Sequence, residues 1–482
     1  MRSTFMGLET ARRALMAQQI GLETTAHNIA NANTPGYSRQ VVQIQAATPF
    51  SPPSWISPAI PGQIGTGVEV AAIQRMRDAF LDGQIRQETS SLGRWETESG
   101  LLNQIELIYN EPSDSGIRNA IDGFWQALQD LSINPESGSA RTVVLRRGEA
   151  LADILNHTYT QLEELRDSIN EDIAVRVTEI NTYAHKIAAL NKQIVDATSV
   201  GDHPNDLMDQ RDKLISELSK LVDVNVITDK YNATTVTVGG VPIVQWDSAR
   251  EIETRDDDNN GLYEIYWKGS PNQVQFRDGV LKGLVEMRDV QLSKHLDAVE
   301  NIIGTLMTQF NAVHQNGYGL NGQTGLNFFE YTDEPLMRVA VTEDQIAASS
   351  LGTDADGDGV IDSIDGENAR SLADILTGKI DIYDKDDPSV IVASGTTLRD
   401  YFSSTISQLG VDAQHAMRMT ENQDVLVNNL ESRQEAVAGV SIDEEMVNMM
   451  KFQHAYNAAA RVMTGLDEMY DVIINRMGLV GR

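Results

Sequence analysis

Residues 442–482 read IDEEMVNMMKFQHAYNAAARVMTGLDEMYDVIINRMGLVGR, and the spacing of their apolar side chains decides the fold at this end of the chain. One apolar row recurs every seven residues, and a second row with the same period follows at an offset of three. Two interlocked rows form the seam of a coiled coil, so the stretch predicts a long helix that needs a partner. The first row is Ile442, Met449, Tyr456, Met463, Tyr470 and Met477, and the second is Phe452, Ala459, Leu466, Ile473 and Val480.

The start of this helix is marked by Ser441 followed by Glu444, which have the spacing of a capping box. A helix from residue 442 to the end of the stretch would be on the order of 55 Å long. Because an isolated helix buries none of its apolar stripe, such a segment depends on packing for its stability.

Residues 4–30 carry a matching amphipathic stripe with a spacing of seven. The apolar side chains of each terminal stripe must be buried, so we expect the two helices to pair with each other or to pack against neighbouring subunits. The predicted assembly interface consists of Phe5, Leu8, Leu15, Leu22, Ile29, Ile442, Met449, Phe452, Tyr456, Met463, Leu466, Tyr470 and Ile473.

The segment after the first stripe, NIANANTPG at residues 28–36, predicts the end of the N-terminal helix. Asparagine side chains compete for backbone hydrogen bonds, Pro35 cannot continue a helix, and Gly36 permits a turn. The chain must therefore leave the helix here.

Length and composition exclude several classes of protein. A chain of 482 residues is too long for one ordinary core, so two to four domains are expected. With 38 Lys and Arg against 70 Asp and Glu, the net charge of −32 repels nucleic acid. The absence of cysteine removes disulfides and thiolate chemistry. No apolar run suits membrane insertion or a cleavable signal peptide, so the residues alone predict a cytoplasmic protein.

The middle of the chain alternates helical and β patterns. A short strand is expected at Val68 to Ile73, and a helix from about Asp78. The longest helical stretch has a four-residue step between Ile169 and Ile173 in a row that otherwise repeats every seven residues, which is a stutter. Helical periodicity returns at about 280–314 and 396–436.

The predicted fold class is multidomain and mainly α, with paired terminal coiled-coil helices and a discontinuous helical bundle interrupted by two insertions. The insertions are a small β-rich domain and an acidic α/β segment with sixteen acidic and four basic residues. The expected boundaries are 1–40 plus 441–482 for the coiled coil, 41–221 plus 273–325 plus 396–440 for the helical middle domain, 222–272 for the β-rich insertion and 326–395 for the acidic insertion.

One segment has metal-ligand spacing, DADGDGVIDSID at 354–365. Oxygen donors at loop positions 1, 3, 5, 9 and 12, with glycine at position 6, match a calcium loop. The last position holds Asp instead of Glu, and the alternative is a solvated acidic turn. No cofactor is required by this interpretation, and Ca²⁺ is the one candidate. The candidate ligands are Asp354, Asp356, Asp358, Val360, Asp362 and Asp365.

Motifs for catalysis are weak. The sequence GYGLNG at 317–322 matches G-x-G-x-x-G, but it follows a predicted helix, whereas a dinucleotide site needs a preceding strand. The eight histidines lack metal-ligand spacing, and no G-x-S-x-G elbow accompanies them. The sequence therefore favours a structural protein over an enzyme, with no catalytic residues.

Several motifs carry a resemblance to known proteins. The run NIANANTPGYSRQ at 28–40, after the stripe from Leu8, resembles the shared start of flagellar rod, hook and hook-associated proteins. The remaining motifs are similar to the hook-associated protein 1 family, and the insertions at 222–272 and 326–395 depart from it. The motifs similar to that family are GTGVEVAAIQR at 65–75, FWQAL at 124–128, DLMDQRD at 206–212, FNAVHQNGYGLNG at 310–322 and GVSIDEE at 439–445.

This resemblance implies a structural role at the junction of hook and filament, where the protein would be needed for filament assembly. The implied partners are other copies of the chain, the hook protein, the second hook–filament junction protein and an export chaperone. The resemblance also implies type III export without a cleaved signal, which revises the location to the extracellular flagellum. The alternatives are another axial protein of hook or flagellin type, or a surface-displayed calcium-binding variant.

Overall fold

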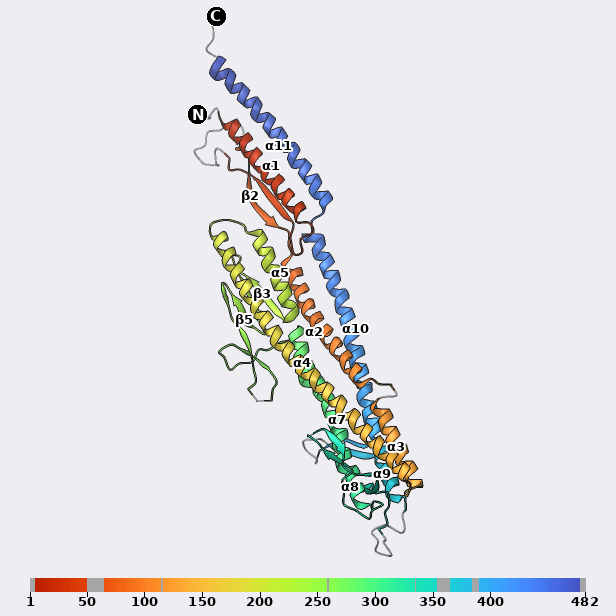
Figure 1. The fold of residues 1–482 in the computed structure, drawn as a ribbon. Coiled ribbons are helices and arrows are strands. Elements are labelled where there is room, and N and C mark those ends of the chain that lie inside the picture. Colours follow the sequence, from red (N-terminus) through yellow and green to blue (C-terminus); the bar gives the residue numbers. More distant parts are fainter. Residues whose placement is uncertain are drawn as a thin grey trace.

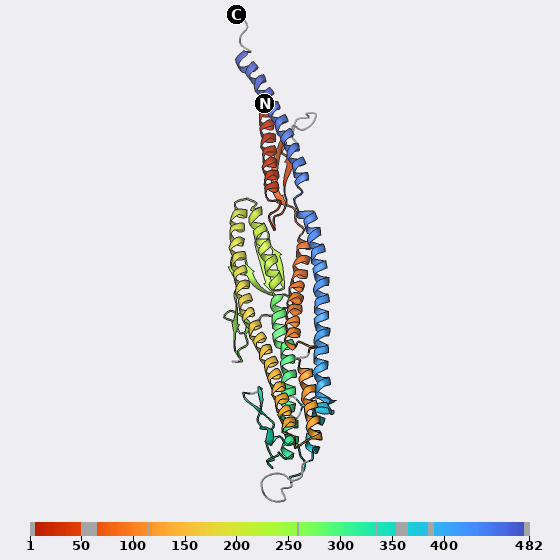
Figure 2. The same cartoon turned by 45° about the vertical axis from the view of Figure 1, so that its right-hand side comes forward.

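The chain folds into an elongated, mainly helical molecule whose two termini lie at the same extremity (Figure 1). The structure, a computed structural model, describes residues 5–49, 65–113, 116–257, 260–333, 335–352, 365–383 and 390–476. Helices follow the long axis, and small antiparallel sheets lie beside them (Figure 2). The predicted fold class, mainly α with helical termini, is confirmed.

Two long helices lie side by side in the part of the molecule between residues 79 and 438, which we call the body. α2 (Ala79–Tyr109) leads away from the terminal end of the molecule, and α10 (Leu398–Ala438) returns along it (Figure 1). The Asp78 side chain caps α2 by accepting hydrogen bonds from two backbone N–H groups of its first turn. The helices predicted from Asp78 and over 396–436 are both confirmed.

The longest helix is α4 (Gly138–Ser199), which spans 62 residues. The predicted stutter lies inside it without a break, because a four-residue step keeps the apolar stripe on one face. α3 (Ile117–Ile133) and α5 (Asn205–Leu221) pack against this stripe. Every member of the predicted row is buried: Leu155, Leu162, Ile169, Ile173, Ile180, Ile187 and Ile194.

A continuous helical path follows the β-rich insertion, as the periodicity at 280–314 predicts. It consists of α6 (Val280–Glu286), α7 (Ser293–Thr305) and α8 (Asn311–Asn316), joined by π-helical turns at Met287–Leu292 and Leu306–Phe310. Its far end packs into an aromatic core whose ring centroids lie 4.7–6.0 Å apart. That core contains Phe124, Phe310, Phe328 and Phe329, all fully buried.

The segment 222–272 is β-rich, as its composition predicts. Four strands form an antiparallel sheet in sequence order, and a separate hairpin follows. The sheet covers α4 through buried valines and isoleucines. The strands are β3 (Val224–Thr228), β4 (Thr234–Val238), β5 (Val241–Gln245), β6 (Ser248–Ala249), β7 (Ile252–Arg255) and β8 (Glu264–Trp267).

The acidic segment lies at the end of the molecule farthest from the termini (Figure 1). Its described residues form two antiparallel hairpins, a short 3₁₀ turn at Glu343–Gln345 and one helix, which packs on α3. Its elements are β9 (Phe329–Tyr331), β10 (Met337–Val339), α9 (Glu367–Thr377), β11 (Ile380–Tyr383) and β12 (Ile391–Thr396).

The terminal extremity is formed by α1 (Met6–Ala30), α11 (Ile442–Asp471) and a hairpin. A π-helical turn at Val472–Arg476 extends α11. The predicted strand near 68 pairs with a partner that the sequence did not suggest: β1 (Gln40–Ala46) is antiparallel to β2 (Val68–Arg75). This hairpin packs on α1, although the sequence boundaries assigned residues from 41 onward to the middle domain.

Candidate functional site: the terminal rod and its joint with the body

α1, α11 and the β1–β2 hairpin together form what we call the terminal rod. α1 lies along α11 in both views (Figure 2). At one end the rings of Phe5 and Tyr470 are 5.3 Å apart. Closer to the middle of the pair, the Phe452 ring lies against the backbone of Gly21, where a Cβ atom would be 2.7 Å from two ring carbons. Small residues on α1 thus let large side chains of α11 approach closely.

Pairing brings the two predicted stripes together but covers them only in part. Glu445 is the one buried residue that the structure describes in α11, with an exposed fraction of 2%. Several predicted interface residues of both helices are half-buried: Leu8, Leu15, Leu22, Ile29, Met449, Phe452, Met463, Leu466 and Tyr470. The remaining four, Phe5, Ile442, Tyr456 and Ile473, stay exposed.

The terminal rod also exposes apolar side chains that the predicted interface did not include. Those on α11 lie on the face that α1 leaves uncovered, and they could have been found by extending the helical pattern beyond the two main rows. These exposed side chains are Met16 on α1 and Met446, Val447, Met450, Val462, Met469, Val472 and Ile474 on α11 and its extension.

A polar cluster joins the terminal rod to the body, and Asn28 lies at its centre with an exposed fraction of 1%. Its Oδ1 accepts hydrogen bonds from the Tyr37 hydroxyl (2.7 Å) and from the backbone N–H of Gln40 (3.0 Å). Its Nδ2 donates to the Gln40 carbonyl (2.9 Å) and to Glu445 Oε2 (3.0 Å). The asparagine-rich turn, the β1 strand and α11 are therefore held by a single side chain.

The link from this turn to α11 is completed by Arg39. Its guanidinium pairs with Glu445 at 2.9 Å and with Glu444 at 3.0 Å. Its backbone amide donates to the carbonyl of Ala438, the last residue of α10. The buried Glu445 thus has charged and neutral partners, which offset the cost of removing its carboxylate from water.

The link to the body is made by α5. Asp209 accepts hydrogen bonds from the Ser38 amide (2.9 Å) and hydroxyl (2.8 Å), and it pairs with Arg75 at 2.6 Å. Asp212 pairs with Arg75, Arg77 and its neighbour Arg211 at 3.0–3.2 Å. We call these residues, with Asn28, Tyr37, Arg39, Gln40 and Glu445, the joint cluster.

The two aspartates of the joint cluster differ in their pKa values. Burial raises the pKa of Asp209 and outweighs the opposing effects of Arg75 and Ser38. Burial would also raise the pKa of Asp212, but Arg211, Arg75 and Arg77 hold it below its ordinary value. Burial, together with the negative charges of Asp206, Asp209 and Glu445, raises the pKa of Tyr37, so its hydroxyl remains a proton donor.

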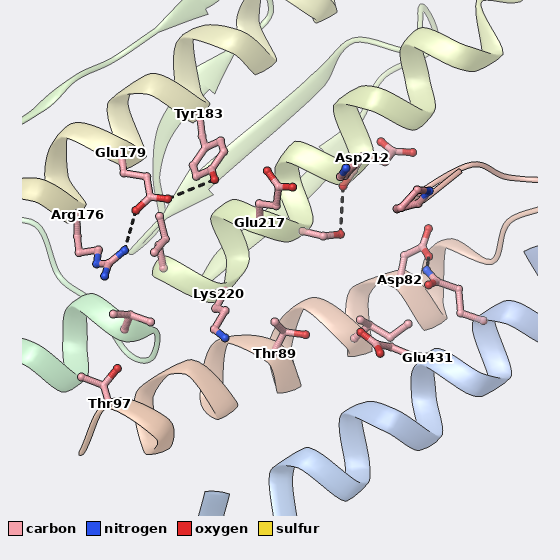
Figure 3. A pocket seen from close by; sticks show the side chains of 18 of the residues that line it. Asp82, Thr89, Thr97, Arg176, Glu179, Tyr183, Asp212, Glu217, Lys220 and Glu431 are labelled. Carbon is pink, nitrogen blue, oxygen red and sulfur yellow. Dashed lines mark hydrogen bonds and ion pairs between the residues drawn. The ribbon is translucent and has the colours of Figure 1, made fainter. Parts of the chain in front are cut away.

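A cleft of about 770 Å³ opens in the body beside the joint cluster, between α2, α4, α5 and α10 (Figure 3). Several of its ionisable groups have partners: the Tyr183 hydroxyl donates to Glu179 at 3.3 Å, and Arg176 bonds the same carboxylate at 3.0 Å. Lys220 pairs with Glu96 at 2.9 Å. Such mutual ion pairing is typical of solvated helix faces.

Five of the six candidate calcium ligands, Asp354, Asp356, Asp358, Val360 and Asp362, lie outside the described residues. The sixth, Asp365, directs its carboxylate at backbone and hydroxyl donors of Ser349 and Ser350, at 2.6–3.0 Å. Burial would raise its pKa, but these hydrogen bonds lower it. Within the described ranges no group of three or more His, Asp or Glu side chains could hold a metal. Calcium binding remains a prediction.

Comparison with known proteins gives the class first. The family model of the flagella basal body rod protein matches residues 8–37, and that of the flagellar basal body rod FlgEFG protein C-terminal region matches residues 434–477. These two ranges correspond to the helices of the terminal rod. The chain is therefore a flagellar axial protein, and it associates with other axial proteins.

The particular family follows from the rest of the chain. The helical domain model of the flagellar hook-associated protein FlgK matches residues 102–329. The chain is 37% identical to flagellar hook-associated protein 1 of Bacillus subtilis (strain 168), over 100% of both, and 26% identical to that of Escherichia coli (strain K12), over 97% and 99%. It belongs to the flagellar hook-associated protein 1 family, which makes it a structural component of the hook–filament junction.

A solved structure shares the fold. The flagellar hook junction protein FlgK from Burkholderia pseudomallei superposes with a TM-score of 0.64 at 18% identity, covering 74% of this chain and all of that one. None of the helices in the described part of this chain is both long and apolar enough to cross a bilayer. Axial proteins of hook or flagellin type, the first alternative from sequence, are not favoured.

Proposed function

We propose that copies of this chain form a ring between the hook protein and the second hook–filament junction protein, and that the filament cannot assemble without it. One observation carries the proposal: the paired α1 and α11 leave a long apolar face exposed at the extremity of the molecule. About ten exposed large apolar side chains on one helix and its extension mark an association surface. The role is mechanical and needs no catalytic step.

The energy available from this face is comparable with the cost of association. About ten apolar side chains on α11 and its extension are close to half-exposed. Complete burial of such a side chain contributes about 1.5–3 kcal/mol, so burying their exposed halves would contribute roughly 7–15 kcal/mol per copy. Association costs about 4–15 kcal/mol in lost translation and rotation. Burial against neighbouring copies and neighbouring axial proteins can therefore offset that cost.

The export route is part of the proposal. A chain without cysteine can pass unfolded through a narrow channel without disulfides to break. The exposed apolar face of α11 would need a cytosolic chaperone before export, because it would otherwise promote aggregation. We therefore expect an extracellular location on the flagellum, reached without a cleaved signal.

Deleting the gene tests the proposed role. A junction protein predicts cells with hooks but no filaments, and flagellin released into the medium. Normal filaments on the deletion strain would refute the role. Truncating residues 442–482 separates assembly from folding: the truncated chain should keep the far-ultraviolet and thermal signatures of its body and lose incorporation into flagella. Unchanged incorporation would refute the part given to α11.

A further inference from the structure

A second pocket, of about 580 Å³, lies between the first half of α2 and the glycine turn that joins β4 to β5. α2 contributes Arg86 and Ser90 to its lining, and the turn contributes Gly239 and Gly240. Both glycines have positive φ angles, 55° and 82°. The pocket is separate from the apolar face of the terminal rod and from the cleft beside the joint cluster.

Arg86 is a half-buried arginine that has no partner among the described residues. Its guanidinium has no hydrogen bond or ion pair with any residue that the structure describes, although the chain has 70 acidic residues. Its Nη2 lies 4.0 Å from the position of a Cβ atom on Gly83, so the head group stays close to the helix backbone. Burial lowers its pKa and outweighs the attraction of the nearest aspartates. An anion at this guanidinium would relieve that cost.

The carboxylates near Arg86 are already engaged. Asp82 pairs with Arg77 at 3.0 Å and also accepts a hydrogen bond from Gln434. Asp212 is shared among three other arginines of the joint cluster. None of the three carboxylates bonded by the neighbouring arginines forms a hydrogen bond or ion pair with Arg86 in the part of the chain that the structure describes. The neighbouring arginines are Arg75, Arg77 and Arg211, and the three aspartates are Asp82, Asp209 and Asp212.

The pocket also holds an unsatisfied polar group. Ser90 has an exposed fraction of 1%, and its hydroxyl has no hydrogen-bond partner among the described residues. Two acidic residues line the pocket, and both have donors: Asp223 accepts from the Arg277 amide at 3.1 Å, and Asp278 from the Ser91 hydroxyl at 3.1 Å. The Arg277 guanidinium is exposed at the rim. Among the described residues, the Arg86 guanidinium and the Ser90 hydroxyl are thus donors of this pocket that have no partner.

We propose that this pocket binds a carboxylate side chain presented by a second copy of this chain in the assembled ring. The proposal rests on the self-association proposed above and adds a specific polar contact to it. A guanidinium forms its strongest hydrogen bonds with carboxylates, often through two parallel N–H groups. Copies that each carry a charge of −32 repel one another, so an unpaired arginine offers a local attraction that favours one register.

The first arm of the test uses the free protein. Glutarate, as a mimic of a glutamate side chain, should raise the thermal unfolding midpoint saturably, in a comparison with sodium chloride at equal ionic strength. Arg86→Gln should weaken the apparent glutarate affinity by roughly tenfold or more, because a hydrogen bond to a charged group is lost. Arg146→Gln is the matched control, since Arg146 is an exposed arginine on α4. No saturable shift of the unfolding midpoint in the wild type, or equal shifts in both variants, would overturn the proposal that this pocket binds a carboxylate.

The second arm uses flagellated cells that express the Arg86→Gln or Arg146→Gln chain. With Arg86→Gln, filaments should detach at lower shear and the loss should increase with salt, whereas Arg146→Gln should resemble the wild type. Equal retention of filaments in the two strains would overturn the assignment of the carboxylate to a second copy. Failure of the proposed function itself would instead appear in the gene deletion, and the glutarate titration does not depend on it.

Discussion

The contact between Gly21 and Phe452 offers the sharpest test of the terminal rod. A methyl group added at Gly21 would lie 2.7 Å from two carbons of the Phe452 ring, against an ordinary carbon contact of about 3.5–4.0 Å. The ring would have to move by about 1 Å, and overpacking of this kind costs about 1–3 kcal/mol. Replacing glycine by alanine inside a helix also stabilises it by about 0.8–1.0 kcal/mol, which obscures the steric effect in a single variant.

Gly465→Ala on α11 removes this ambiguity. Gly465 lies in the partner helix, and a Cβ atom placed on it has no neighbour within 4 Å. The gain in helix propensity is then common to both variants, and the difference between them is the steric cost alone. We expect amide hydrogens in the middle of α1 to exchange about 5 to 150 times faster in Gly21→Ala than in Gly465→Ala, which corresponds to 1–3 kcal/mol of local opening.

Hydrogen exchange measured by mass spectrometry on the two purified variants checks this expectation. The double variant with Gly21→Ala and Phe452→Leu should recover most of the protection, because the smaller side chain leaves room for the methyl group. Equal exchange rates in Gly21→Ala and Gly465→Ala would refute the packing of Phe452 on Gly21, and with it the register of the helix pair.

Three further perturbations test other parts of the molecule. Asn28→Ala should destabilise the joint cluster by about 2–4 kcal/mol, since it strips partners from buried groups including Glu445; unchanged exchange of the β1 amides would contradict this. Stability to urea should fall as the pH decreases from 6.5 to about 4, because burial lowers the pKa of His295 and His314 to about 4 and the unfolded chain takes up these protons first. His314→Gln should reduce this loss of unfolding free energy by at most roughly 3 kcal/mol, and an unchanged loss would exclude His314 as its source. Calorimetric titration with Ca²⁺ tests the loop at 354–365: the wild type should release or absorb heat that the Asp356→Ala, Asp358→Ala variant does not, and no heat at millimolar metal would reject the site.

The sequence alone determined the features that depend on local periodicity. The rows in α4 and α10 repeat at the helical period, and each became one unbroken helix, because a stripe of that period can be buried only in that conformation. The C-terminal rows became α11 up to Asp471 and a π-helical turn to Arg476, and Met477 and Val480 of these rows lie outside the described residues. The asparagine-rich turn ended α1 as predicted, at Ala30. The β-rich composition of 222–272 likewise needed only local propensity and turn residues.

Only the tertiary structure decided how distant segments meet. Asn28 and Glu445 are 417 residues apart, and Ser38 and Asp209 are 171 apart, so no spacing rule could join them into one cluster. Each was visible in the sequence only as a polar residue in a motif. The same limit applies to exposure: periodicity identified the apolar rows of α11, but only the position of α1 shows which part of them stays uncovered. Burial depends on the packing of elements far apart in the chain, and for that reason both the joint cluster and the Arg86 pocket had to be read from the folded molecule.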